Sequence, residues 1–244
     1  MLHILRADAG QSTARGPFRI RRIRPGAVLG AGADPAFGPF SVIDHADLAV
    51  GTVVPMHEHK NDEILSYMWR GTMLHEDTAG NHIPISANKL MMMNAGESFW
   101  HEERTPDDPV EMLQIFIRPS DADLPALVDF HDRPDGAPTD RWGLVAGPEG
   151  SNAPLTVRNA VRVYDLHLHK GQEIEVPAVM GLSPWLYVMD GVVEVGGERL
   201  GKGDAVSDLN QPLPTVRSMT DATLVLFLVD RTAPASTAGT ISGR

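Results

Sequence analysis

The chain has 244 residues, of which 42% are hydrophobic and 22% charged, as is usual for a globular protein that can bury a large core. Its formal net charge of −11, with no run of lysine and arginine, argues against direct nucleic-acid binding. Without cysteine, any metal would have to use nitrogen and oxygen ligands. We find neither a secretory signal nor an apolar stretch of the roughly 20 residues needed to cross a membrane, so we expect a cytoplasmic protein.

Short apolar runs, cut at frequent intervals by glycine, proline, asparagine or aspartate, predict an all-β protein. The strands expected in the first half cover residues 63–69, 73–77, 89–94 and 110–117. Those expected in the second half cover residues 161–169, 185–190, 192–195 and 223–229. For residues 124–130 a short helix is an alternative interpretation.

Residues 119–152 are rich in proline, glycine and aspartate, which predicts a connector. Similar sequences at 67–71 and 187–191 indicate that the two halves are similar β-barrels in tandem. We therefore expect three parts: an N-terminal barrel over 1–135, a C-terminal barrel over 136–231 and a small, polar, flexible tail over 232–244.

Two pairs of side chains in the first half have the spacing i, i+2. His57 and His59 form one pair, and His101 and Glu103 form the other. Alternate side chains of a strand leave the same face, so each pair would point into a barrel together. Three imidazoles and a carboxylate make an open site for a divalent metal, and this ligand set suits iron, manganese, nickel, copper and zinc alike.

The residues around these pairs resemble known motifs. Gly51, His57-x-His59, Glu63 and Gly71 follow the first conserved motif of the cupin superfamily, with one extra residue before the last glycine. The segments that resemble the pirin family are 57–67 (HPHRGFETVTY in pirins), 75–81 (HxDSxGN), 94–103 (TAGxGxxHSE) and 113–116 (LQLW). The resemblance is dense from about residue 37 to 119, and it implies a bicupin whose first barrel holds the metal.

The resemblance also implies roles. Pirins use two histidines of HxH and the histidine and glutamate of HxE, here His57, His59, His101 and Glu103, most often for iron(II). Some pirins cleave the flavonol quercetin with dioxygen. Glu103 is the expected base for the flavonol hydroxyl. Glu63 would hold a ligand imidazole or serve as a reserve ligand, although an ion pair with Lys60 or Arg70 explains it equally well.

Other histidines are expected to have no metal role. His167 and His169 repeat the i, i+2 spacing, but they stand at the wrong distance from the repeated segment, so we expect the C-terminal barrel to lack a metal site. His75 and His82 flank a hairpin and are expected to be exposed.

Departures from the pirin pattern concern the substrate more than the ligands. Glu58 replaces a proline, Asn61-Asp62 replaces Gly-Phe, and the bulky segment 97–100 replaces a small one. The leading hypothesis is a dioxygenase for a flavonol or another enol-containing aromatic. The alternatives are a non-catalytic, redox-sensing regulator that binds a protein partner, and a different cupin reaction such as isomerisation or decarboxylation.

Overall fold

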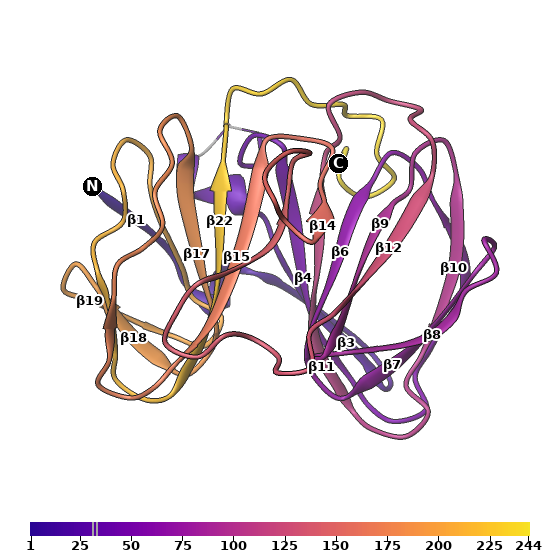
Figure 1. Ribbon diagram of the computed structural model, residues 1–244, viewed down its shortest axis with the longest axis horizontal. Helices are drawn as coiled ribbons and strands as arrows, with labels where there is room; N and C mark the ends of the chain where they lie inside the picture. Colours follow the sequence, from indigo (N-terminus) through magenta and orange to yellow (C-terminus); the bar gives the residue numbers. More distant parts are fainter. Residues whose placement is uncertain (31, 33) are drawn as a thin grey trace.

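The computed structural model describes residues 1–30, 32 and 34–244. Apart from two short 3-10 turns, Ala7–Ala9 and Pro25–Leu29, its regular elements are strands, arranged in three sheets. The strands form two curled bodies that lie side by side, with the first half of the chain on the right of Figure 1 and the second half on the left. The predicted all-β fold is therefore confirmed. No helix in the described part of the chain is long and apolar enough to cross a membrane.

The N-terminal body is one sheet in the order β2-β3-β4-β11-β6-β9-β8-β7-β10-β5, with β12 also paired to β9. The strands are β2 (Gln11–Arg15), β3 (Phe18–Ile23), β4 (Phe40–Leu48), β5 (Val53–His59), β6 (Glu63–Arg70), β7 (Thr72–Asp77), β8 (His82–Ser86), β9 (Lys89–Asn94), β10 (Phe99–Arg104), β11 (Val110–Ile117) and β12 (Leu127–Asp132).

The C-terminal body combines a seven-stranded sheet, β1-β20-β17-β22-β15-β13-β14, with a four-stranded sheet, β16-β21-β18-β19. Its strands are β1 (Leu2–Leu5), β13 (Gly143–Gly147), β14 (Leu155–Thr156), β15 (Val161–Leu168), β16 (Glu173–Ile174), β17 (Ser183–Asp190), β18 (Val192–Val195), β19 (Glu198–Gly201), β20 (Ala205–Asp208), β21 (Val216–Ser218) and β22 (Ala222–Val229).

The helical interpretation of residues 124–130 is wrong, because this region contains strand β12, which pairs with β9 along its whole length. Val128 and Phe130 pack against the core, two residues apart, while Leu127 and Asp129 are exposed. That alternation has the period of a strand, and it is too short to stand out within a segment rich in aspartate and proline.

The two bodies share one hydrophobic core. The ring of Phe40 on β4 stacks on Phe227 of β22, with centroids 4.1 Å apart, and meets Trp185 of β17 edge-on at 5.3 Å. All three rings are fully buried and belong to a cluster with members from both halves of the chain. The bodies are therefore fixed against each other by apolar packing as well as by the connector.

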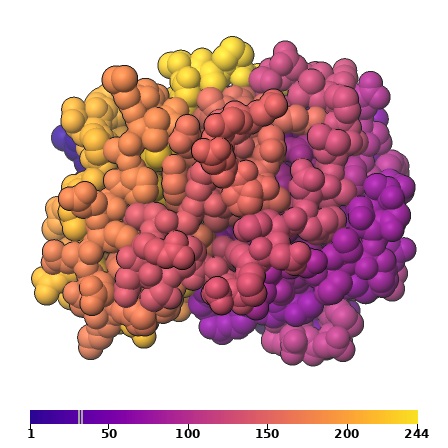
Figure 2. Space-filling model, in the orientation of Figure 1, coloured from indigo at the N-terminus to yellow at the C-terminus, as the bar shows by residue number. Residues whose placement is uncertain are grey.

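Each end of the chain lies on the body formed by the other half. Strand β1, inside the range 1–135 expected for the N-terminal barrel, pairs with β20 of the C-terminal sheet. Residues 232–244, expected as a flexible tail, run over the top of the molecule to the N-terminal body (yellow in Figures 1 and 2), where Ser242 is fully buried. Their small polar side chains show no apolar pattern in the sequence, but several of their backbone groups form hydrogen bonds with the N-terminal body.

Candidate metal centre

Strand register brings the two predicted pairs together. Strands β5 and β10 are antiparallel neighbours, and His101 lies directly opposite His57. On its other side β10 pairs with β7, which places Glu103 opposite His75. Opposed residues of neighbouring strands point to the same face of the sheet, so the imidazoles of β5, β7 and β10 converge on one interior.

Three of the predicted ligands form a compact cluster. The Nε2 atoms of His57 and His59 are 3.1 Å apart, and the ring of His101 lies 4.3 Å from that of His57 and 5.2 Å from that of His59, centroid to centroid. One ring nitrogen from each residue falls within 4.8 Å of the others, a spacing at which one ion can touch all three. His101 and His59 are buried, whereas His57 is half-buried at the rim.

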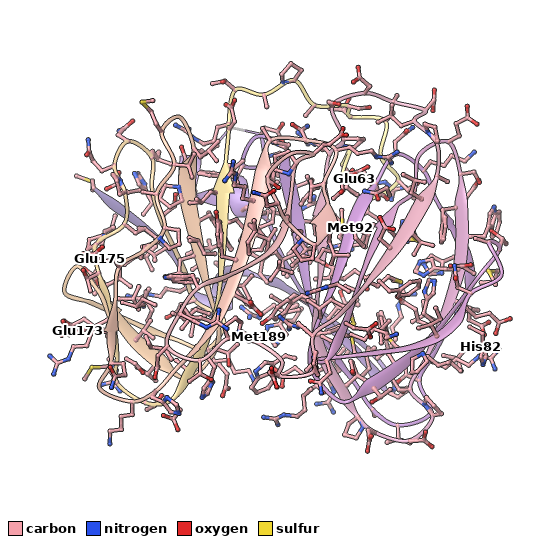
Figure 3. The ribbon with its side chains drawn as sticks, in the orientation of Figure 1. Glu63, His82, Met92, Glu173, Glu175 and Met189 are labelled. Atoms are coloured by element: carbon pink, nitrogen blue, oxygen red, sulfur yellow. The ribbon has the colours of Figure 1, made fainter. Side chains whose placement is uncertain are left out.

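Glu103 lies beside this cluster and forms a second group with His101 and His75, again with ligand atoms within 4.8 Å. Its Oε1 is 3.7 Å from Nδ1 of His101. The expectation that His75 is exposed was wrong, because this side chain is completely buried and bonded through Nε2 to Oδ2 of Asp77 at 2.8 Å. The sequence alone could not show this burial, because it depends on which residue of β10 lies opposite His75. His82, by contrast, is exposed at the outer edge of the N-terminal body (Figure 3).

Several buried polar atoms at this point have no hydrogen-bond partner among the described residues: both ring nitrogens of His101, Nδ1 of His75 and Oε1 of Glu103. Unpaired buried polar atoms are rare in folded proteins, and each costs desolvation free energy. A divalent cation could take one ring nitrogen of His101 together with Oε1 of Glu103, and imidazole with carboxylate is a donor set suited to first-row metals. The residues present therefore fit a metal ion.

Burial sets the protonation of these groups. It lowers the pKa of His101 to about 2, with further lowering by His57, His59 and His75. Burial also lowers the pKa of His57. It raises the pKa of Glu103 to about 7, against the opposing effects of His59 and a hydrogen bond with Gln114. Burial thus favours the neutral form of His57 and His101, which is the form that binds a metal, and the Glu103 carboxyl group exchanges its proton near neutral pH.

The outer nitrogen of each β5 histidine has its own partner. Nδ1 of His59 bonds to Oδ2 of Asp62 at 3.0 Å, and Nδ1 of His57 bonds to the backbone oxygen of Pro55 at 2.9 Å. Such partners fix the tautomer and leave Nε2 free to face the centre. Sequence reasoning missed Asp62, although a carboxylate three residues after a candidate ligand is a signal that could have indicated it.

Glu63 does not make the contact expected of it. Its buried carboxylate accepts hydrogen bonds from Nε of Arg158 at 2.9 Å, from the backbone N–H of Arg158 at 3.0 Å and from the amide of Asn94. The histidine contact that we predicted for Glu63 belongs to its neighbour Asp62, and the cation that pairs with it is neither Lys60 nor Arg70. Figure 3 shows Glu63 high in the N-terminal body, on the side that faces the other half.

Among the described residues, both groups with metal-ligand geometry lie in the N-terminal body. In the other body, His167 and His169 stand with ring centroids 5.4 Å apart, and exposed His169 bonds to Asp140 at 2.8 Å. His169 and Asp140 thus form an ordinary surface ion pair.

A cavity of about 170 Å³ borders the cluster. The residues that line it on the metal side are His57, His59, Glu103, Gln114, Phe116 and Ile241. Strands β3 and β4 form the opposite wall, where Arg22 and Asp44 make a two-fold ion pair at 2.6 and 2.8 Å. Its lining combines apolar side chains with a few polar groups, as small-molecule sites do, but its volume is below their usual range of about 300–1,000 Å³.

Two cupin barrels in tandem, with one histidine-rich cluster in the first, define a bicupin. The Pirin family model matches residues 18–117, and the model of the quercetinase C-terminal cupin domain matches residues 144–229. The chain belongs to the pirin family.

Relatives and solved structures agree with this assignment. The chain is 26% identical over 199 residues to the quercetin 2,3-dioxygenase of Escherichia coli K12, covering 80% of this chain and 85% of that protein. It is 27% identical over 192 residues to a pirin-like protein of Caulobacter vibrioides, covering 78% and 83%. The bacterial pirin YhhW of E. coli, solved in complex with nickel(II), superposes with a TM-score of 0.81 at 21% identity over 94% of this chain and 99% of that one. A quercetin 2,3-dioxygenase from Acinetobacter baumannii gives 0.73 at 19% identity over 91% and 84%. These matches confirm the tandem cupin fold, and the histidine cluster of this chain fits a divalent metal.

Proposed function

We propose that this pirin is a metal-dependent dioxygenase that acts on quercetin or a related flavonol or enol-containing aromatic. The observation that carries the proposal is the convergence of imidazoles and a carboxyl group, with unpaired polar atoms, beside a cavity. Relatives named as quercetin 2,3-dioxygenases over most of the chain support the substrate class.

His57, His59, His101 and Glu103 would hold the metal, for which we propose iron(II). Manganese, nickel, copper and zinc accept the same ligands, so iron rests on the likeness to pirins that use it. The metal supplies Lewis acidity and, as iron, the capacity to react with dioxygen. His75 stands opposite Glu103, with a ligand atom within 4.8 Å of those of Glu103 and His101.

The chain's own residues provide the acid–base chemistry. Glu103 would accept the proton of the substrate hydroxyl, because a carboxylate can exchange metal ligation for proton acceptance. Gln114 shares a hydrogen bond with this carboxyl group and so limits its orientation. Phe116 and Ile241 give the cavity apolar walls that can accept an aromatic ring and exclude water.

The test is oxygen consumption by protein loaded anaerobically with iron(II) and then mixed with quercetin and oxygen. We expect uptake that His101→Gln abolishes and that His82→Gln, the same change at an exposed histidine, leaves intact. Uptake no greater than that of free iron(II) would refute the activity.

Metal analysis of natively purified protein separates the alternatives. Full occupancy by zinc or manganese would favour another cupin reaction. Bound iron without consumption of oxygen would favour the regulator that binds a protein partner. This hypothesis is tested by comparing partner binding of wild type and His101→Gln under oxidising and reducing conditions. The cytoplasmic location stays a prediction.

A further inference from the structure

Residues 236–242, here called the C-terminal strap, run beside the metal ligands of the N-terminal barrel. After β22 the backbone N–H of Ser236 donates to the carbonyl of Pro119 at 2.8 Å. The strap then pairs with Lys60, the residue after the ligand His59. Thr240 N–H donates to the Lys60 carbonyl at 2.9 Å, and Lys60 N–H donates to Oγ1 of Thr240 at 2.8 Å.

The strap also supplies most of the hydrogen bonds to the Asp62 carboxylate. Oδ1 accepts from the backbone N–H of Ser242 at 2.9 Å and from its hydroxyl at 2.7 Å, and Oδ2 accepts from Ile241 N–H at 3.1 Å. Oδ2 is also the atom that bonds to Nδ1 of His59. Asp62 and Ser242 are both fully buried. A buried carboxylate is costly unless such donors surround it, so the strap stabilises the group that orients the imidazole.

Several contacts hold the strap in one place. The Ser242 carbonyl accepts from the hydroxyl of Ser41 at 2.6 Å and from Nε of Arg118 at 2.8 Å. At Gly239 the approach is so close that an added Cβ would collide with the Ser242 hydroxyl and with Oδ1 of Asp62. The Ile241 side chain packs on the apolar cluster inside the barrel and lines the cavity beside His57 and His59.

We propose that the C-terminal strap is part of the metal centre, with Ser242 and Asp62 as positioning residues that hold the His59 imidazole with Nε2 toward the ion. This inference rests on the proposed metal site and adds that a segment about 180 residues away in sequence completes it. Partners that orient a metal-bound imidazole commonly change metal affinity 10- to 100-fold when they are lost. Displacing the strap should therefore weaken metal binding without touching a ligand.

The test compares two pairs of matched variants. Gly239→Ala forces the strap off Asp62, whereas Gly201→Ala adds the same methyl group where no atom lies within 4 Å. Ser242→Ala removes a buried hydroxyl that bonds to Asp62, whereas Ser207→Ala removes one that bonds only to the Pro184 carbonyl at 2.7 Å in the other barrel. Circular dichroism and thermal unfolding establish that each variant is folded.

The first readout is the dissociation constant for nickel(II), from competition with a chromophoric chelator. We expect it to rise about 10-fold or more for Gly239→Ala, by a smaller factor for Ser242→Ala, and to stay unchanged in the two controls. The second readout is nitrogen-15 NMR of the His59 ring in metal-free protein. We expect a proton on Nδ1 in the wild type and a mixture of tautomers in Gly239→Ala.

The two readouts separate the two proposals. If the wild type does not bind nickel(II), the proposed metal site is refuted. The tautomer of His59 would then be the measurement that tests whether the strap positions this ring. Folded Gly239→Ala and Ser242→Ala proteins with wild-type nickel affinity and an unchanged His59 tautomer would overturn the role of the strap.

Discussion

Replacing Glu103 by glutamine should stabilise the metal-free protein, although it removes a proposed metal ligand. The carboxyl group is buried, and Oε1 has no partner among the described residues. Its pKa is about 7 in the folded protein, against an ordinary value of 4.5. The amide keeps the shape of the side chain and cannot ionise, so the variant avoids the cost of a buried negative charge.

The sign and size of this stability difference follow from the folded and unfolded pKa values of Glu103. Below pH 4.5 the carboxyl group is neutral in both the folded and the unfolded chain, and it costs nothing. Between pH 4.5 and 7 the unfolded chain loses this proton first, so the free energy of unfolding falls as the pH rises. Above pH 7 the full cost is present, and at 1.36 kcal/mol per pKa unit it amounts to about 3 kcal/mol.

The assay is urea unfolding of wild type and Glu103→Gln in excess chelator at pH 5 and pH 8. The advantage of the variant should grow by about 2.5 kcal/mol between these two conditions. Burial of His101 gives a pH dependence of the opposite sign, since its pKa is lowered, but that contribution is common to both proteins and cancels. With excess nickel(II) the order should reverse, because only the wild type offers the carboxylate ligand.

An advantage that is equal at pH 5 and pH 8 would refute the reasoning. It would mean that Glu103 ionises in the folded protein as easily as in the unfolded chain, through water or a partner that reaches Oε1. A raised pKa of Glu103 in the metal-free protein would then have no support.

Three further predictions concern packing and metal. Arg158→Ala should lower the free energy of unfolding in urea by about 3–5 kcal/mol, because it leaves Glu63 buried without its cation, while the affinity for nickel(II) stays the same. A large loss of nickel affinity would instead indicate that Glu63 acts at the metal site. Phe40→Ala should cost about 3–5 kcal/mol by opening a cavity between the barrels, and a loss under 1 kcal/mol would contradict a shared core. Nickel(II) at 100 times its dissociation constant should raise the free energy of unfolding by about 2.7 kcal/mol, reversibly with chelator, and no shift would count against the site.

The clustering of these histidines could be predicted from sequence because its signal is local. Two residues apart on one strand share a face whatever the rest of the fold does, which holds for His57 and His59 and again for His101 and Glu103. The motifs around them then identified the barrel type. The edges of β9, β11 and β18 were predictable for the same reason, since apolar alternation and turn residues lie next to each other in the chain.

The supporting residues could not be predicted this way. Glu63 lies an even number of residues after His59, so simple alternation would put both on one face. However, the chain turns between β5, which ends at His59, and β6, which begins at Glu63, and Asn61 in this turn has a left-handed φ of 52°. The alternation of side chains along β5 therefore does not continue into β6. His75 depends on the register of β7 against β10, and Ser242 depends on a contact across 180 residues. Neither the strand register nor this long-range contact can be recognised from neighbouring residues in the sequence.

The position of the strap has a consequence for the order of events during synthesis. Domains of a growing chain generally fold as units, beginning at the N-terminus, so the strands of the first barrel can pair while the second is still being made. The donors that hold Asp62 belong to residues 241 and 242, which the ribosome adds after all the strands of both barrels. A nascent chain would therefore carry a folded first barrel with a loosely held His59, and would gain full metal affinity only when these late residues emerge.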